Sequence, residues 1–128
     1  LGGDLVLSVL AESLHSAADR FQPDLVLVSA GLDGHRDDPL SHFRLESADY
    51  ARLTELCLLV ANEHAAGPLV AVLEGGYNLA ALGESSAAHV AALLAGLASR
   101  MAPAPPESGG CWVFWSAARS SLPGNRRT

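Results

Sequence analysis

The chain has 128 residues and a formal net charge of −6, since its 8 basic residues, all arginine, face 14 acidic ones. Apolar residues make up 49% of the sequence and charged residues 17%, a composition that favours a folded chain over a disordered one. The length suffices for one modest domain and is too short for two ordinary ones. Binding to nucleic-acid phosphates needs a basic excess, so we expect no direct nucleic-acid partner.

Other compositional features bear on location and completeness. Cys57 and Cys111 are too few for a disulfide framework, which fits the cytoplasm, or the nucleus in a eukaryotic cell. The chain begins with leucine and Met101 is its only methionine, which indicates a fragment of a longer protein. The longest apolar stretches, 56–61 and 90–98, fall short of the roughly 20 residues of a bilayer span. We therefore expect a soluble chain with no membrane partner.

The first predicted elements are a helix over residues 4–20 and a strand over residues 24–29. Apolar residues of the helix recur at spacings of three and four, and Pro23 follows its end. One face of this helix carries Val6, Leu10, Leu14, Ala17 and Phe21. The strand holds four consecutive branched aliphatic residues without polar alternation, which is typical of a strand buried on both faces of a parallel sheet.

A loop over residues 30–46 leads to a second set of elements. Ser47 is a candidate cap for a helix to about Ala66, which Gly67-Pro68 ends. Its predicted buried side comprises Leu53, Leu56, Cys57 and Val60. A second buried strand follows at 69–73 and a third helix at 85–99. The apolar positions of this third helix are Val90, Leu93, Leu94 and Leu97.

This order of helices and strands predicts an α/β fold with a parallel sheet flanked by helices. In such sheets ligands bind beyond the carboxyl ends of the strands, so the two loops that follow the strands are the candidate site. We place the domain at residues 1–100 and interpret residues 101–128, rich in proline and glycine, as a flexible tail. The alternative for the tail is a docking segment anchored by Trp112 and Trp115.

The loop after the first strand carries four acidic or imidazole side chains within six residues: Asp33, His35, Asp37 and Asp38. Carboxylate oxygen and imidazole nitrogen are both zinc ligands, so this cluster is a candidate metal site. The alternative from spacing alone is a solvated acidic loop, in which Asp38-Pro39 makes a turn.

The loop after the second strand reads Glu74-Gly75-Gly76-Tyr77. Adjacent glycines permit positive φ and a close backbone approach, and they would let the loop direct Tyr77 into a cleft. There a phenol can donate a hydrogen bond to a developing oxyanion. The alternative is that the tyrosine only packs against the core.

Two segments together resemble the zinc-dependent histone deacetylase family. The first is residues 23–33 with His35, Asp37 and Asp38-Pro39-Leu40 after it, and the second is Leu73-Glu74-Gly75-Gly76-Tyr77-Asn78. The similarity covers residues 3–99 and is closer to the class II and bacterial amidohydrolase-like branch than to class I. It implies the C-terminal part of an arginase/deacetylase-type fold, with acetylated lysine or another N-acetyl amine as substrate.

The resemblance also implies roles for particular residues. Asp33, in a Ser-Ala-Gly-x-Asp motif, matches a zinc ligand, and Tyr77 matches the tyrosine that polarises the scissile amide carbonyl. Gly75 and Gly76 fall at the substrate site beside this tyrosine. Leu40 stands where polyamine-specific members carry a glutamate, which favours acyl-lysine substrates over acetylpolyamines.

Two family motifs have no match in this chain. Family members use a pair of adjacent histidines, but the histidines here, at 15, 35, 42, 64 and 89, are never adjacent. Family members also use an Asp-x-His pair as further zinc ligands. The string Asp33-Gly34-His35 has this pattern but lies inside the Ser-Ala-Gly-x-Asp motif, so we interpret it as a coincidence. We therefore expect a fragment of a zinc amidohydrolase that is inactive in isolation. The alternative is a noncatalytic, truncated interaction module of the same fold.

Overall fold

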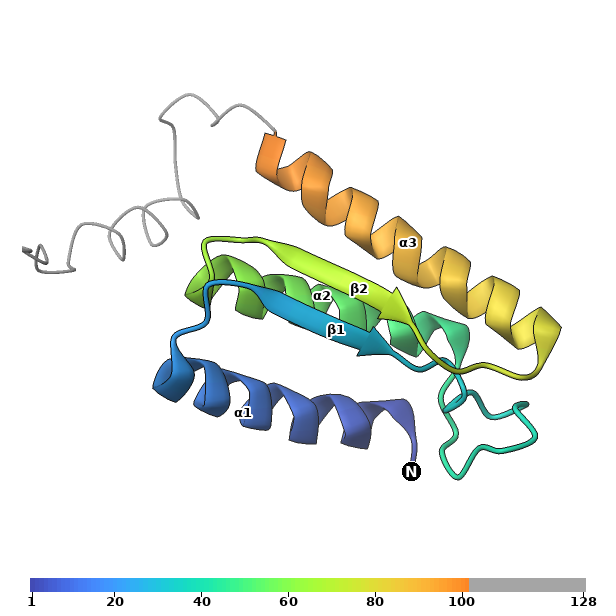
Figure 1. The fold of residues 1–128 in the computed structure, drawn as a ribbon. Helices are drawn as coiled ribbons and strands as arrows, with labels where there is room; N and C mark the ends of the chain where they lie inside the picture. Colours follow the sequence, from blue (N-terminus) through green and yellow to red (C-terminus); the bar gives the residue numbers. More distant parts are fainter. Residues whose placement is uncertain (102–128) are drawn as a thin grey trace, which may run out of the picture.

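A computed structural model of the chain describes residues 1–101, so the predicted tail lies outside the described residues except for Met101. The elements are α1 (Gly3–Phe21), β1 (Val26–Ala30), α2 (Ser47–His64), β2 (Leu69–Leu73) and α3 (Leu79–Met101). Figure 1 shows this order of helices and strands along the chain. The predicted α/β class and the predicted order of elements are confirmed.

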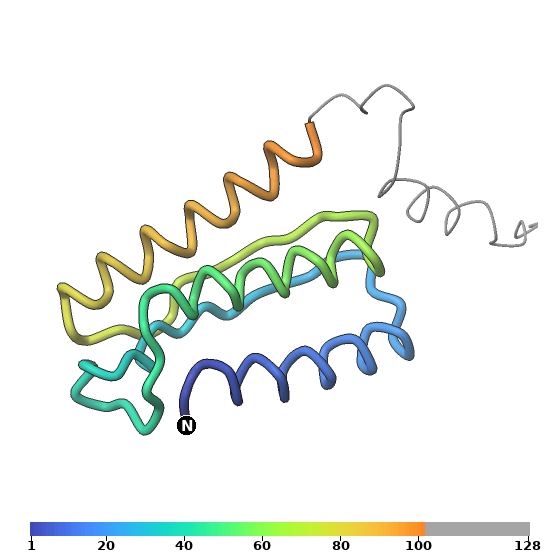
Figure 2. Tube along the Cα trace, turned by 180° about the vertical axis from the view of Figure 1, so that it is seen from behind, coloured from blue at the N-terminus to red at the C-terminus, as the bar shows by residue number. Residues whose placement is uncertain are grey.

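The two strands pair in parallel, as the sequence predicts. Val26 lies opposite Leu69 and Ala30 lies opposite Leu73. Helix α2 connects β1 to β2 and contacts both strands. Helices α1 and α3 each contact α2. The strands lie in front of α2 in Figure 1 and behind it in Figure 2, with α1 and α3 on either side. The loops that follow β1 and β2 therefore leave the sheet at the same end.

The prediction that both strands are buried on two faces is wrong for the described residues. Alternate side chains of each strand are exposed, and Leu27 is 70% exposed. The exposed face also carries Val70 and Val72. An apolar run indicates a strand, but burial depends on what covers each face. Here α2 covers one face and no described element covers the other.

Helix α1 packs through positions spaced by four. Val6, Leu10 and Leu14 are half-buried, and Ala18 continues this row as the helix's buried residue. The prediction that Ala17 and Phe21 belong to the packed face is wrong, since both are exposed. Phe21 is the last residue of the helix and is 80% exposed.

Helix α2 begins at Ser47, but its cap is Glu46 rather than the predicted Ser47. Glu46 and Asp49 form a capping box, in which the Glu46 backbone N–H donates to the Asp49 carboxylate at 2.9 Å. The helix ends at His64, two residues before the predicted end, because Ala66 adopts a left-handed φ of 55°. Its buried residues are Tyr50, Thr54, Val60 and Ala61, whereas the predicted Leu53, Leu56 and Cys57 are half-buried.

Helix α3 starts six residues earlier than predicted and packs through small residues. Its buried positions are Ala81, Ser85 and Ala92. The predicted apolar face is therefore mostly wrong: Leu93 is half-buried, and the exposed residues include Val90, Leu94 and Leu97. A Cβ atom on Gly96 would lie 2.7 Å from Leu58 Cδ1, so the absence of a side chain permits the close approach of α3 to α2.

By length and composition alone, α3 is also a helix that could cross a membrane. An 18-residue window of this helix has a mean hydropathy of 1.3, and 17% of the window is buried. The sequence expectation counted unbroken apolar runs, whereas alanines keep the mean hydropathy high across the whole helix. A core helix of a soluble protein passes the same test, so the expectation of no membrane partner stays a prediction.

The uncovered face of the sheet predicts self-association of the isolated chain. Replacing Leu27 and Val72 together by threonine removes apolar area from this face and places a β-branched residue, which favours strands, at both positions. Analytical ultracentrifugation should show assemblies for the wild-type chain and a larger monomer fraction for the double variant. Ser29→Thr, also in β1 and exposed, is the matched control. A wild-type monomer with one sharp thermal transition would contradict the prediction.

Candidate active site

The loop after β1 is packed at its base and at His35 and Asp38, whereas Asp37 is exposed and Asp38-Pro39 makes the turn that the solvated alternative predicted. Leu32, Leu45 and Tyr50 form a buried hydrophobic cluster at its base. The Tyr50 hydroxyl donates a hydrogen bond to the Leu32 carbonyl at 3.0 Å. Burial, followed by the negative charges of Asp33 and Asp38, raises the pKa of Tyr50 to about 12. Tyr50 therefore remains a neutral donor that holds the loop in place.

Asp33 lies between glycines of both loops. A Cβ atom on Gly75 would lie 2.7 Å from Asp33 Oδ2, and one on Gly31 would lie 3.0 Å from Oδ1. The Leu32 N–H donates to the Gly75 carbonyl at 2.7 Å, which holds the two loops together at this point. Among residues 1–101, no side-chain hydrogen bond or ion pair involves the Asp33 carboxylate. Within these residues its oxygens are therefore uncommitted, and a carboxylate oxygen is one of the ligand types that zinc accepts.

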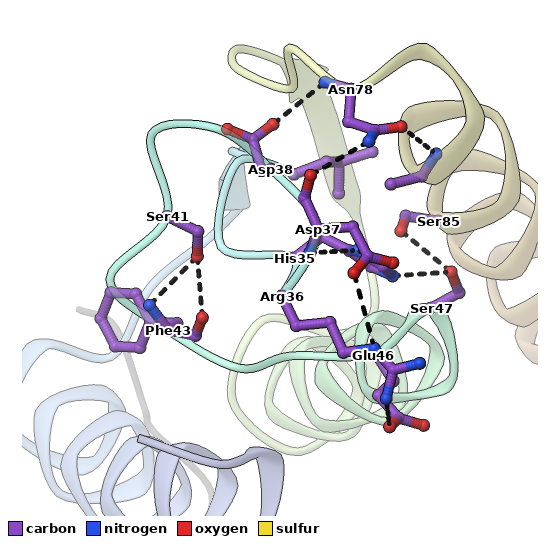
Figure 3. A network of polar contacts seen from close by, with 12 residues as sticks. His35, Arg36, Asp37, Asp38, Ser41, Phe43, Glu46, Ser47, Asn78 and Ser85 are labelled. Atoms are coloured by element: carbon purple, nitrogen blue, oxygen red, sulfur yellow. Dashed lines mark hydrogen bonds and ion pairs between the residues drawn. The ribbon is translucent and has the colours of Figure 1, made fainter.

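His35 packs the loop against the helices and is 5% exposed. The Asp37 backbone N–H donates to His35 Nδ1 at 3.2 Å, which assigns the ring proton to Nε2. Nε2 lies 3.5 Å from the Ser47 hydroxyl, which lies 3.2 Å from the Ser85 hydroxyl, as Figure 3 shows. Both ring nitrogens therefore have structural contacts, which agrees with the interpretation of the Asp-x-His string as a coincidence.

Asp38 joins the two loops and is only 7% exposed (Figure 3). Its Oδ2 accepts hydrogen bonds from the backbone N–H groups of Tyr77 at 2.7 Å and Asn78 at 3.2 Å. Its Oδ1 accepts from the Leu40 N–H at 3.0 Å. Burial raises the pKa of Asp38, but these three donors together with His35 outweigh it, and the net pKa lies below the usual 3.8. Asp38 is therefore an anion at neutral pH.

Tyr77 is 58% exposed, so it is not a core residue of the described part of the chain. Gly76, directly before it, has a φ of +146°, and a Cβ there would lie 2.7 Å from Leu82 Cδ1. A glycine is therefore required for the turn that places Tyr77. Within residues 1–101 the phenol hydroxyl takes part in no hydrogen bond.

A hollow of about 360 Å³ lies beside Asp33. Its walls comprise Val6, Gly31, Asp33, Gly34, Leu40, Ser41, His42, Phe43 and Leu45. The structure therefore brings Asp33 and Leu40 to one hollow and places Gly75 against the Asp33 carboxylate. Tyr77 is anchored at the same end of the sheet but is not among the residues that line this hollow.

The described residues do not make a complete zinc site. Asp33 offers one carboxylate, but no group of three or more histidine, cysteine, aspartate or glutamate side chains within residues 1–101 could hold a metal ion. Burial raises the pKa of the Cys57 thiol, which makes the reactive thiolate less accessible. A catalytic zinc with three protein ligands needs residues from beyond the described part.

Sequence reasoning missed the connection that Asp38 and Asn78 make between the loops. The Asn78 side chain donates to the Asp37 carbonyl at 3.0 Å, and its oxygen accepts from the Ala81 N–H at 3.1 Å (Figure 3 shows the residue). Asn78 is therefore the N-cap of α3. Asparagine immediately before an apolar segment is a cap signal, and it indicates the true start of this helix.

Comparisons with known proteins agree with this geometry. The sequence profile of the histone deacetylase domain matches residues 1–93. Histone deacetylase 14, chloroplastic, of Arabidopsis thaliana is 42% identical over 93 residues, which are 72% of this chain and 22% of that protein. The polyamine deacetylase HDAC10 of Homo sapiens is 42% identical over 92 residues, 72% of this chain and 12% of that protein.

A solved structure supports the same assignment. The HDA15 HD domain aligns with a TM-score of 0.61 and 33% identity, over 75% of this chain and 26% of that chain. This chain thus spans roughly a quarter or less of the length of these relatives. The profile match covers well over half of the 128 residues and includes both loops of the candidate site. The chain belongs to the histone deacetylase family.

Proposed function

We propose that this chain supplies one zinc ligand, Asp33, and the catalytic tyrosine, Tyr77, to a deacetylase that hydrolyses acetyl-lysine-type or related N-acetyl amides. One observation carries the proposal. The Asp33 carboxylate lies against Gly75, two residues before Tyr77. Both loops begin at the same end of the two paired strands. Family membership supports the reaction class, which is hydrolysis of an acetylated amine.

In this proposal Asp33 holds the metal with help from ligands that the described residues do not provide. Zinc, when bound, acts as a Lewis acid that polarises the amide carbonyl and activates water for hydrolysis. The family's adjacent histidines have no counterpart in this sequence, so the general base comes from outside the chain. The chain in isolation is therefore expected to show no turnover.

Tyr77 performs its step through its hydroxyl group. As water adds to the amide carbon, negative charge develops on the carbonyl oxygen, and a phenol O–H donates a hydrogen bond to it. The exposed ring and the glycine turn before it support this role. This hydrogen bond strengthens as charge develops, so it stabilises the transition state more than the bound substrate and lowers the barrier to hydrolysis.

Leu40 supports a substrate preference. It lines the hollow beside Asp33, and its uncharged side chain is exposed on the wall of that hollow. Such a wall suits the aliphatic stem of an acetylated lysine and provides no carboxylate for the second ammonium group of a polyamine. The similar proteins include one named for polyamines, HDAC10, and one named for histones, histone deacetylase 14. We favour acetyl-lysine.

The alternative, a noncatalytic interaction module, is supported by the exposed apolar face of the sheet. The two proposals differ when the chain is combined with the missing portion of a deacetylase domain. Turnover of an acetyl-lysine peptide by the combined protein supports the enzyme. Stable binding of that portion without turnover supports the module.

Asp33→Ala should abolish zinc binding in an intact deacetylase domain that contains this chain. The substitution removes a ligand, so both the zinc content and the deacetylation rate should fall sharply. Elemental analysis after dialysis measures the first and a peptide assay the second. Asp37→Ala, which changes a carboxylate that is 61% exposed in the same loop, is the matched control. A wild-type zinc stoichiometry in Asp33→Ala would overturn the ligand assignment.

Tyr77→Phe should lower kcat in the same intact domain by about 10²–10³, or roughly 3–4 kcal/mol, the usual effect of losing one oxyanion donor. The variant deletes one oxygen and keeps the ring, so the fold and zinc content should not change. Steady-state kinetics and elemental analysis test both expectations. A near-wild-type kcat in Tyr77→Phe, with unfolding of Tyr77→Ala, would mean that the tyrosine only packs.

A further inference from the structure

The segment that carries Tyr77 is held on both sides of its two glycines. Before them, the Glu74 N–H donates to the Ala30 carbonyl at 3.1 Å, and the carbonyl of the first glycine, Gly75, accepts from the Leu32 N–H at 2.7 Å. After them, the N–H groups of Tyr77 and Asn78 both donate to Asp38 Oδ2. The first anchor extends the strand pairing. In the second, the Asn78 side chain also donates to the Asp37 carbonyl and caps α3, but the bond that holds Tyr77 itself comes from the Asp38 carboxylate.

The second anchor matters because the two glycines are a flexible joint. Glycine has access to more of φ/ψ space than any other residue, and Gly76 already has a left-handed φ. The ring of Tyr77 is 58% exposed and its hydroxyl forms no hydrogen bond within residues 1–101, so side-chain packing contributes little to its placement. The position of Tyr77 therefore rests on its backbone N–H.

Asp38 is held in a position where its carboxylate accepts a hydrogen bond from that N–H. It is 7% exposed, and its own backbone is fixed by turns, with the Asp38 N–H donating to the His35 carbonyl at 2.9 Å. Hydrogen bonds from N–H groups to an ionised carboxylate are shorter and stronger than those between neutral groups, and the bond from Tyr77 measures 2.7 Å. The remaining oxygen is occupied by Leu40 of the same loop.

We propose that Asp38 is a positioning residue that holds Tyr77 in place for deacetylation, acting through the backbone of Tyr77 and without contact to the substrate. The inference rests on the proposed function of Tyr77. It requires that loss of the Asp38 carboxylate release the segment after the glycines, so that the phenol samples positions away from the developing oxyanion. A displacement of about 1 Å in a catalytic group can cost 10²-fold in rate.

The test is a double-mutant cycle in an intact deacetylase domain that contains this chain. The variants are Asp38→Ala, Tyr77→Phe and the combination of both. Asp38→Ala should lower kcat about 10- to 100-fold, with little change in KM and no change in zinc content. Because the proposed effect of Asp38 on the rate is to place the Tyr77 hydroxyl, the same substitution in the Tyr77→Phe background should cause almost no further loss of kcat.

Two further variants complete the design. Asp38→Asn keeps an oxygen that can accept from Tyr77 and Asn78, so it should retain much of the activity. If Asp38→Ala does not fold, Asp38→Asn takes its place in the cycle, with a smaller loss that again disappears beside Tyr77→Phe. Asp37→Asn is the control, because it keeps the carbonyl that Asn78 contacts and alters only an exposed carboxylate.

The outcomes separate the two proposals. A large loss in Tyr77→Phe together with equal losses from Asp38→Ala in both backgrounds overturns the positioning role and leaves the function of Tyr77 intact. A wild-type kcat in Tyr77→Phe overturns the proposed function of Tyr77 itself. A loss from Asp38→Ala that appears only when the Tyr77 hydroxyl is present supports the inference.

Discussion

The parallel pairing of β1 with β2 is the constraint on which the site depends. Because the strands run in the same direction and in register, Ala30 and Leu73 end side by side, and each loop begins next to the other. The pairing continues beyond the strands through the Leu32–Gly75 hydrogen bond. Asp33 and Tyr77 are 44 positions apart in the chain, and this backbone contact brings their loops together, with the Asp33 carboxylate against Gly75.

Small residues permit the other close approaches. Gly75 admits the Asp33 carboxylate, and Gly96 admits Leu58 where α3 crosses α2. Ser85 is fully buried at the same interface and reaches the Ser47 hydroxyl. When helices pack through glycine, alanine and serine, their larger apolar residues face outward. The exposed leucines of α3 and the uncovered face of the sheet both fit a chain that spans 26% of a related deacetylase domain.

Sequence patterns predicted the elements well and their environments less well. Apolar runs located both strands, because a strand's own residues determine such a run. The alternation of helices and strands indicated that the strands pair in parallel. Burial of Leu27 and of the α3 leucines was wrong, since periodicity finds an apolar face but not what covers it. The motifs located Asp33 and Tyr77, whose assigned roles stay predictions. The hydrogen bonds of Asp38 could not be foreseen, because they join loops that only the folded chain brings together.

The hydrogen bonds of Asp38 also explain how the main chain of Tyr77 can be fixed while its side chain has no partner within residues 1–101. Arg36, its near neighbour in sequence, pairs with Glu46 at 2.6 Å instead, so the buried carboxylate depends chiefly on backbone donors. Every residue except proline offers such an N–H, so this anchor places no demand on the side chain at position 77. The side chain of Tyr77 therefore remains uncommitted while its main chain is held. In the proposed enzyme the N–H of Tyr77 determines where the residue lies, and its hydroxyl is left to stabilise the charge that develops on the substrate.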